Sequence, residues 1–251
     1  MNQTSPPTED YVPLPGVRRL PADAPWRWLR AGWSDFRRAP LHSLAYGGLV
    51  VLVSYLITGV TYATGNWVLM FSLLTGFMLI GPVLAFALYE TSRQLQQGRA
   101  VSMADCLQAV RSNFGNELIF AVVLLIVLLV WARAAALVHV FFPAMSNPAL
   151  SQLAAFFGVG TAVGAVFAAV VFAVSAFSLP MMMDRRADVI TAVITSFAAV
   201  LQNKGVMLIW AAIILVSVLI GFATAFLGLV VTLPLIGYAT WHAYQETIEA
   251  S

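Results

Sequence analysis

Long apolar stretches separated by short polar segments form the main pattern of this chain. A helix that crosses the hydrocarbon layer of a membrane needs about 20 mostly apolar residues. Such stretches occur at residues 41–61, 67–89, 118–142 and 153–179. The pattern therefore predicts membrane-spanning helices rather than the core of a water-soluble domain.

A further apolar stretch, residues 206–244, is too long for one crossing. As a single helix it would extend about 58 Å at about 1.5 Å per residue, nearly twice the thickness of the hydrocarbon layer. We expect a hairpin instead, with its turn within GFATAFLG (221–228), where two glycines relax the backbone. The prediction is six spans, and a single span over residues 206–244 is the alternative.

The basic residues test this count independently, because Lys and Arg gather near span ends on the cytoplasmic side. All 13 basic residues except Arg133 lie before span one, between spans two and three, or between spans four and five. The other connectors, near residues 62–66, 143–152 and 221–228, contain no Lys or Arg. This bias predicts a multi-pass protein of a bacterial inner membrane with both termini in the cytoplasm. Five spans would place the C-terminus outside.

A short motif, Ala-x-x-(Ser/Thr)-x-Phe, precedes each predicted pair of spans. Its copies are AGWSDF (31–36), AVRSNF (109–114) and AVITSF (192–197). We expect each copy to lie in an amphipathic helix on the cytoplasmic side, followed by a transmembrane hairpin. The fold class is then all-α, with pseudo-repeats over about 25–98, 102–183 and 188–245. Chance matching in an Ala-, Val- and Phe-rich chain is the alternative.

The first and third of these expected helices carry apolar stripes at helical spacing. Those stripes are Trp26, Leu29, Trp33 and Phe36 in the first, and Ile190, Val193, Ile194, Phe197 and Leu201 in the third. We expect Trp26, Arg27, Arg30, Trp33 and Arg37 to lie at the lipid interface and to bind anionic lipid. Simple topology signalling is the other reading. Residues 1–24 are proline-rich and are expected to form a disordered arm before a transmembrane domain at 25–251.

Composition agrees with a membrane protein. Of the 251 residues 61% are hydrophobic and only 10% are charged, whereas soluble domains carry about 25% charged residues. The net charge of +2 is too small to indicate a nucleic acid partner. The single cysteine, Cys106, allows neither an intrachain disulfide nor a metal site built from cysteines. The phosphate-binding, zinc-protease and hydrolase motifs do not occur, so we expect no enzyme, no catalytic residues, no cofactor and no metal.

A few polar residues in or near the spans are candidates for function. Arg133 is the only charge inside a predicted span, which makes it a functional candidate unless it snorkels to the outer interface. His139 follows it near the outer end of the same span, and His242 lies at the inner end of the last span. Asp184 belongs to a charged turn after SLPMMM, where it or Asp188 can cap the next helix.

Segments of the chain resemble a known family. They are WLRAGWSDFRRAP (28–40), GPVLAFALYETSRQLQQG (81–98), SLPMMMDRRADVITAVITSF (178–197) and GYATWHAYQ (237–245). The chain looks like a bacterial family of six-span integral membrane proteins of unknown function, some of which carry the label of cytochrome c oxidase subunit I. That label implies many more spans and a full set of histidine ligands. This chain has three scattered histidines, so we reject it as a function.

The leading hypothesis is a non-enzymatic accessory, assembly or membrane-organising protein that acts through lipid and protein contacts, with a membrane-protein partner or a homo-oligomer as possible assemblies. The alternative is a small-molecule or ion transporter or channel component. Transport sites usually need polar residues near the membrane midplane and broken helices. The sequence offers Arg133 and the prolines Pro82, Pro180 and Pro234 as hints.

Overall fold

The computed structural model describes residues 15–65, 85–141, 150–185 and 187–249. Within these ranges the regular structure is helical, apart from one antiparallel bridge between Val17 and Ile248. Residues 85–96 also form a helix, which has no number of its own in the figures. The labelled helices are α1 (Ala24–Arg38), α2 (Pro40–Thr64), α4 (Met103–Phe141), α5 (Leu150–Ser175), α6 (Ser178–Arg185), α7 (Val189–Gln202), α8 (Lys204–Ala223) and α9 (Leu229–Thr247). The predicted all-α class is confirmed.

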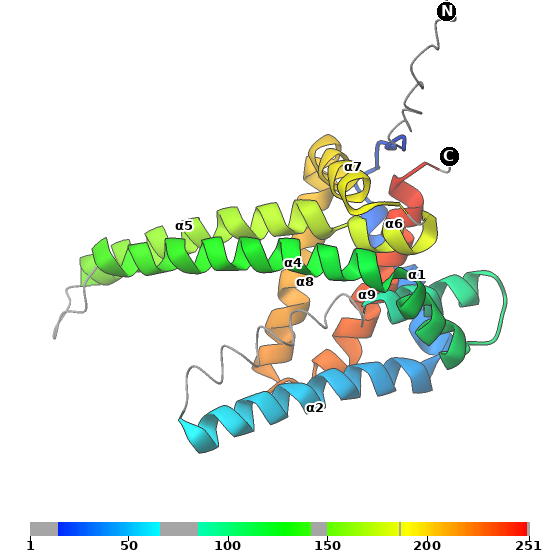
Figure 1. Ribbon diagram of the computed structural model, residues 1–251, viewed down its shortest axis with the longest axis horizontal. Helices are drawn as coiled ribbons and strands as arrows, with labels where there is room; N and C mark the ends of the chain where they lie inside the picture. Colours follow the sequence, from blue (N-terminus) through cyan, green and yellow to red (C-terminus); the bar gives the residue numbers. More distant parts are fainter. Residues whose placement is uncertain (1–14, 66–84, 142–149, 186, 250–251) are drawn as a thin grey trace, which may run out of the picture.

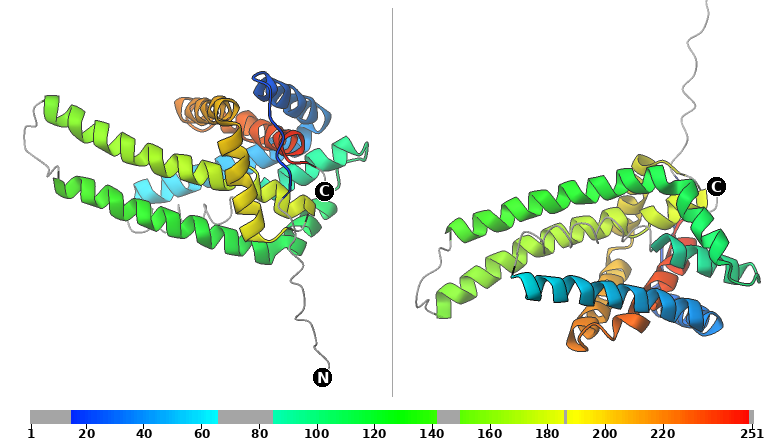
Figure 2. Two further views of the ribbon diagram at one scale, coloured as in Figure 1. Left: turned by 90° about the horizontal axis from the view of Figure 1, so that it is seen from above. Right: turned by 60° about the horizontal axis from the view of Figure 1, so that its bottom comes forward.

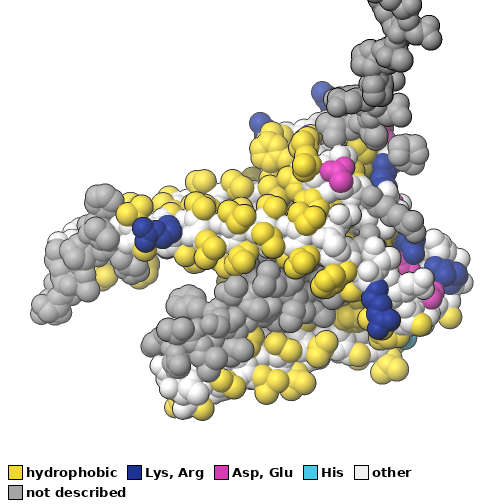
Figure 3. All heavy atoms as spheres, in the orientation of Figure 1, with side chains coloured by type: hydrophobic (Ala, Val, Ile, Leu, Met, Phe, Trp, Pro, Cys, Tyr) yellow, Lys and Arg dark blue, Asp and Glu magenta, His cyan; other side chains and the backbone are white. Residues whose placement is uncertain are grey.

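The molecule has one densely packed end from which long helices project. Figure 1 shows α4 and α5 side by side along the long axis, while the α8–α9 hairpin runs across that direction. The two views in Figure 2 agree on this arrangement. On the face shown in Figure 3, hydrophobic side chains cover the projecting α4 and α5, and most charged side chains gather at the packed end.

Four of the described helical segments are long and apolar enough to cross a membrane. They are Pro40–Thr64, Phe114–Leu137, Leu150–Arg185 and Lys204–Ala223, the third of which includes α6. Only 11% to 28% of the most apolar part of each segment is buried within the protein, so most of this apolar surface is available to lipid. Most of the predicted span 67–89 lies outside the described residues, and α9 is not among the four. The count of six spans is therefore not confirmed.

The predicted hairpin over residues 206–244 is present, because α8 ends at Ala223 and α9 begins at Leu229. The reason we gave for its turn is wrong in detail. Gly228 has ordinary right-handed backbone angles, and the left-handed positions are Ala225 and Phe226, with φ of 49° and 70°. The ring of Phe226 packs edge-on against Tyr55 of α2 at a centroid distance of 5.8 Å, so a tertiary contact supports this turn.

Of the three expected surface helices, the first and the third are separate helices, α1 and α7, and the second is not. The second is not a separate element, because α4 continues without a break from Met103 into the span. The start of α4 is capped, because the Ser102 hydroxyl accepts a hydrogen bond from the Asp105 amide at 3.3 Å. The third, α7, is a separate helix whose apolar stripe is left exposed: Ile194 is 47% exposed, whereas Ala192 and Ala199 on the other side are fully buried.

Two glycines allow α9 to pack closely against its neighbours. A side chain at Gly47 of α2 would overlap the Val230 carbonyl oxygen of α9, and one at Gly32 of α1 would meet the Ala239 amide nitrogen at 2.8 Å. The glycines of α5, 158, 160 and 164, have no described atom within 4 Å of such a position. Close approach between helices therefore occurs at α9 and not at these positions of α5.

Three segments that are distant in sequence meet at the packed end. The Arg18 amide donates to the Thr247 carbonyl at 2.8 Å, and the Glu249 amide donates to the Gly16 carbonyl at 2.9 Å. Asn203, between α7 and α8, accepts from the Leu20 amide at 2.8 Å and donates to the Arg18 carbonyl at 3.0 Å. Residues 16–20 therefore form a terminal clasp with residues 247–249, whereas we expected the disordered arm to continue to residue 24.

Candidate functional site

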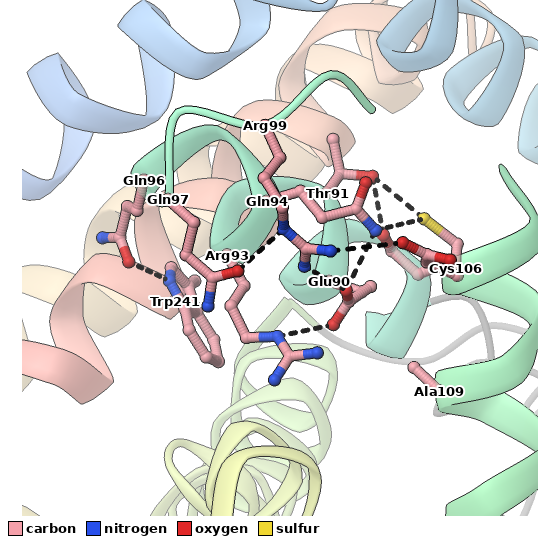
Figure 4. Close-up of polar contacts among 12 residues, drawn as sticks. Glu90, Thr91, Arg93, Gln94, Gln96, Gln97, Arg99, Cys106, Ala109 and Trp241 are labelled. Carbon is pink, nitrogen blue, oxygen red and sulfur yellow. Dashed lines mark hydrogen bonds and ion pairs between the residues drawn. The ribbon is translucent and has the colours of Figure 1, made fainter. Parts of the chain in front are cut away.

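A partly buried polar cluster joins α1, the helix at 85–96 and α9. Asp35 of α1 is 3% exposed, and its carboxylate accepts from His242 Nε2 at 2.8 Å and from the Ser92 hydroxyl. Gln96 Nε2 lies 3.1 Å from His242 Nδ1, and Gln96 Oε1 accepts from the Trp241 indole at 2.9 Å. We call these five residues the Asp35–His242 cluster; Figure 4 shows its Gln96–Trp241 contact.

The hydrogen bonds of the Asp35–His242 cluster define one consistent proton arrangement. The Gln96 amide uses its oxygen for Trp241, so its nitrogen must donate to His242 Nδ1. Nε2 then carries the imidazole proton and donates it to Asp35. In this arrangement His242 links α9 to α1 through Nε2 and to the helix at 85–96 through Nδ1.

Ser92, His242 and Asp35 have the residue types of a hydrolase triad but not its geometry. A nucleophilic serine needs the imidazole as proton acceptor, and the aspartate on the far ring nitrogen. Here Asp35 accepts from both other residues, and Ser92 Oγ lies 3.5 Å from Nε2. Ser92 is also fully buried. This order of partners activates no hydroxyl for attack on a substrate.

A second polar cluster ties the helix at 85–96 to the start of α4 (Figure 4). Glu90 is 1% exposed and accepts from Arg93 Nε at 2.7 Å and from Gln94 Nε2 at 2.9 Å. Gln94 Oε1 in turn accepts from the Ser102 amide at 2.7 Å. The thiol of Cys106 lies 3.6 Å from the Thr91 hydroxyl, and burial raises its pKa. Cys106 is therefore a buried neutral thiol rather than a reactive one.

Asp184 takes part in a contact between α6 and the end of α9. The Tyr244 hydroxyl donates to Asp184 at 2.8 Å and accepts from Arg185 Nε at 2.9 Å. Arg185 also donates to the Glu249 carbonyl at 2.6 Å. The expected cap is made by Asp188, which accepts from the Thr191 amide at 3.0 Å, and this hydrogen bond lowers the pKa of Asp188.

The candidate polar residues of the spans do not form one site. Arg133 lies far along α4 with an exposed side chain, His242 lies in the Asp35–His242 cluster, and Asp184 lies beside Tyr244. His139 is in the last turn of α4, and its side chain is outside the described residues. Within the described ranges, no group of three or more His, Cys, Asp or Glu side chains is arranged to hold a metal ion.

Of the five residues of α1 that we expected at the lipid interface, four are exposed and one forms an ion pair within the protein. Trp26 is 55% exposed and Trp33 is 45% exposed, and Arg30 and Arg37 are exposed beside them. Arg27 instead pairs with Glu246 of α9. Phe36 also departs from the expected stripe, because it is 8% exposed and belongs to the core.

Sequence reasoning missed the buried acids Asp35, Glu90 and Glu117. Asp35 carried a weak signal, because it is the only acidic residue in a basic helix. Glu90 carried a local one, since Arg93 and Gln94 follow at helical contact spacing. Glu117 is 2% exposed, and neither of its carboxyl oxygens has a hydrogen-bond partner among the described residues.

Long exposed apolar helices and a packed polar end define an integral membrane protein. Residues 69–184 match the model of a family described as predicted integral membrane protein (DUF2189). The matched segment includes two of the resembling segments, at least in part, and it confirms the predicted likeness to an uncharacterised family of membrane proteins. No curated protein and no solved structure matches the chain.

Proposed function

We propose that this protein is a non-enzymatic accessory, assembly or organising protein of a bacterial inner membrane, with six spans and both termini in the cytoplasm. The observation that supports it best is how the polar side chains of the packed end are used. Asp35, Glu90 and Asp184 all hydrogen-bond to other parts of the same chain. They join helices and leave the long apolar surfaces of α2, α4, α5 and α8 for lipid or a partner protein.

Reporter fusions test the topology in this proposal. Fusions after residues 64 and 147 should report the outside, and a fusion at the C-terminus should report the inside. An outside C-terminus would reject the six-span topology. The fusion at the C-terminus tests the α8–α9 hairpin in particular, which runs across the direction of α4 and α5 (Figure 1).

Crosslinking in native membranes tests the accessory role. The full chain, crosslinked in cells and purified in detergent, should carry the same membrane-protein partner in replicate preparations. Two cysteine-free variants are compared, and each carries one photoreactive residue. In the first it replaces Ile126, which is exposed, and in the matched control it replaces Trp210, which is buried. Only the exposed position should yield a partner adduct, and equal yields at both positions, or none, would contradict the proposal.

One observation favours transport as the second candidate. Glu117 is a buried carboxyl without a described partner at the inner end of the Phe114–Leu137 span, and such groups mark ion pathways in many membrane proteins. Other polar side chains give transport no support, since Ser175 and Thr232 bond to backbone carbonyls of α5 and α8. Ion or solute flux into proteoliposomes that is lost in Glu117→Gln would establish transport and reject the accessory role.

A further inference from the structure

Two adjoining hollows lie along the outer face of α1. The first, with a volume of about 460 Å³, is lined by Arg30, Trp33, Ser34, Arg37 and Arg38. The second, with a volume of about 360 Å³, is lined by Trp26, Leu29, Arg30, Trp33 and Leu235 of α9. Arg30 and Trp33 belong to both. A basic hollow and an apolar hollow thus share one wall.

The basic hollow holds three guanidinium groups without an acidic side chain in its lining. The acidic residue nearest in sequence, Asp35, is turned inward to His242 and Ser92. Arg38 donates to the Leu95 carbonyl at 2.9 Å, which fixes its position at the hollow. Among the described residues, Arg30 and Arg37 form no ion pair. Guanidinium groups are the side chains best suited to bind the oxygens of a phosphate.

The apolar hollow decides which kind of phosphate fits. A free phosphate would use only the arginines and would leave the adjoining Trp26, Leu29 and Leu235 uncovered. A phospholipid covers both hollows, with its phosphate at the arginines and the start of an acyl chain between Trp26 and Leu235. Exposed tryptophans are also the residues that favour the membrane interface.

We propose that this surface binds one anionic phospholipid, its phosphate held by Arg30, Arg37 and Arg38 and its acyl chain held by Trp26, Leu29 and Leu235. The inference rests on the proposed function in one respect, because it needs α1 at the inner face of the membrane. It goes beyond general attraction to a charged surface, because it names a site for a single lipid.

Native mass spectrometry of the detergent-purified full chain tests the site. Phosphatidylglycerol and phosphatidylcholine with the same acyl chains are offered together, and phosphatidylglycerol should be retained preferentially at one copy per chain. Arg30→Gln with Arg37→Gln should weaken its retention by about thirtyfold, as expected for two arginines near a phosphate. The matched control, Arg19→Gln with Arg111→Gln, removes the same charge from exposed side chains outside the hollows and should retain the lipid.

Two further arms keep the outcomes distinct. In the first, Trp26→Ala should weaken retention of phosphatidylglycerol. In the second, excess glycerol 3-phosphate should not displace the lipid. Displacement would show a site for a small anion and would overturn the inference. Equal loss in both double variants would reduce the effect to general charge and would overturn it too. A chain whose C-terminus reports inside but which shows no preference for phosphatidylglycerol would refute the lipid site alone. An outside C-terminus would refute the topology.

Discussion

The packed end and the projecting helices are built from similar residues but use them in opposite ways. At the packed end Trp28 and Trp210 meet edge to face at a centroid distance of 5.4 Å, and each is 1% exposed. Along α4 the apolar Ile126 and Leu129 are more than half exposed. The difference shows that apolar content alone does not locate the core of this protein. The core lies where polar groups fix the helices against one another, and elsewhere the apolar surface is left to lipid.

The largest expected effect comes from a tryptophan at the packed end. Trp210→Ala should lower the free energy of unfolding by about 3–5 kcal/mol, because it leaves a cavity against Trp28. Trp131→Ala is the matched change in the projecting helices, where the side chain is 39% exposed, and it should cost less than about 1 kcal/mol. Thermal unfolding of both variants in detergent measures the difference. Equal losses would remove the distinction between the two regions.

A charge on the projecting helices tests whether their exposed surface faces lipid. Ile126→Asp should disfavour membrane insertion by about 2.5–3.5 kcal/mol, because Ile126 is 56% exposed in the middle of an apolar span. Ile126→Ala removes the same side chain without adding charge and should insert normally. A reporter after residue 147 and alkaline extraction measure insertion. Normal insertion of the aspartate variant would show that this surface does not contact lipid.

Asp35→Asn tests whether a buried acid holds the packed end together. An amide keeps one acceptor but turns a donor toward His242 or Ser92, so the free energy of unfolding should fall by about 2 kcal/mol. The control is Asp105→Asn, because the Asp105 side chain is 43% exposed and its ion pair with Arg99 is long, at 3.4 Å. Its loss should stay within about 0.5 kcal/mol. A double-mutant cycle with His242→Ala should give a coupling energy, and the absence of coupling would show that the Asp35–His242 contact contributes nothing.

The smallest expected effect is at the α7 cap. Asp188→Ala should cost about 1 kcal/mol, whereas Asp188→Asn should retain most of the cap. The Thr191 hydrogen bond lowers the pKa of Asp188 below its ordinary value of 3.8, so the ionised cap stabilises the fold above about pH 4. That contribution is lost as the pH falls through the lowered pKa. Between pH 7 and pH 3 the wild type should lose more stability than Asp188→Asn, and parallel losses would contradict the role of the charge.

Hydropathy predicted the parts of the fold that depend on local sequence. It located α2, α5 and α8, and the excess length of residues 206–244 predicted the hairpin. The Asp188 cap was one of two choices, since it is a contact between residues three apart. The separation of the second surface helix from its span was wrong, because α4 continues through SNFGN (112–116) in spite of its asparagines and glycine.

Contacts between distant segments could not be predicted in the same way. Asp35 and His242 are 207 residues apart, and each reads alone as an ordinary polar residue near a span end. Their meeting depends on α1 lying against α9, which in turn needs Gly32 to admit the Ala239 backbone. The repeated motif gave part of the information needed to find these buried polar residues. Its fifth position is Asp35 in the first copy and Ser196 in the third, and both are buried hydrogen-bonding residues.

The terminal clasp has a consequence for how the chain is made. Val17 is synthesised well before its bridge partner Ile248. The segment at residues 16–20 thus cannot take its final position until residues 247–249 have been made. A product truncated before α9 would lack both the partner of this segment and the surface on which α1 rests. Completion of the packed end is thereby coupled to the synthesis of residues 247–249, which lie far along the chain from the segment that they hold.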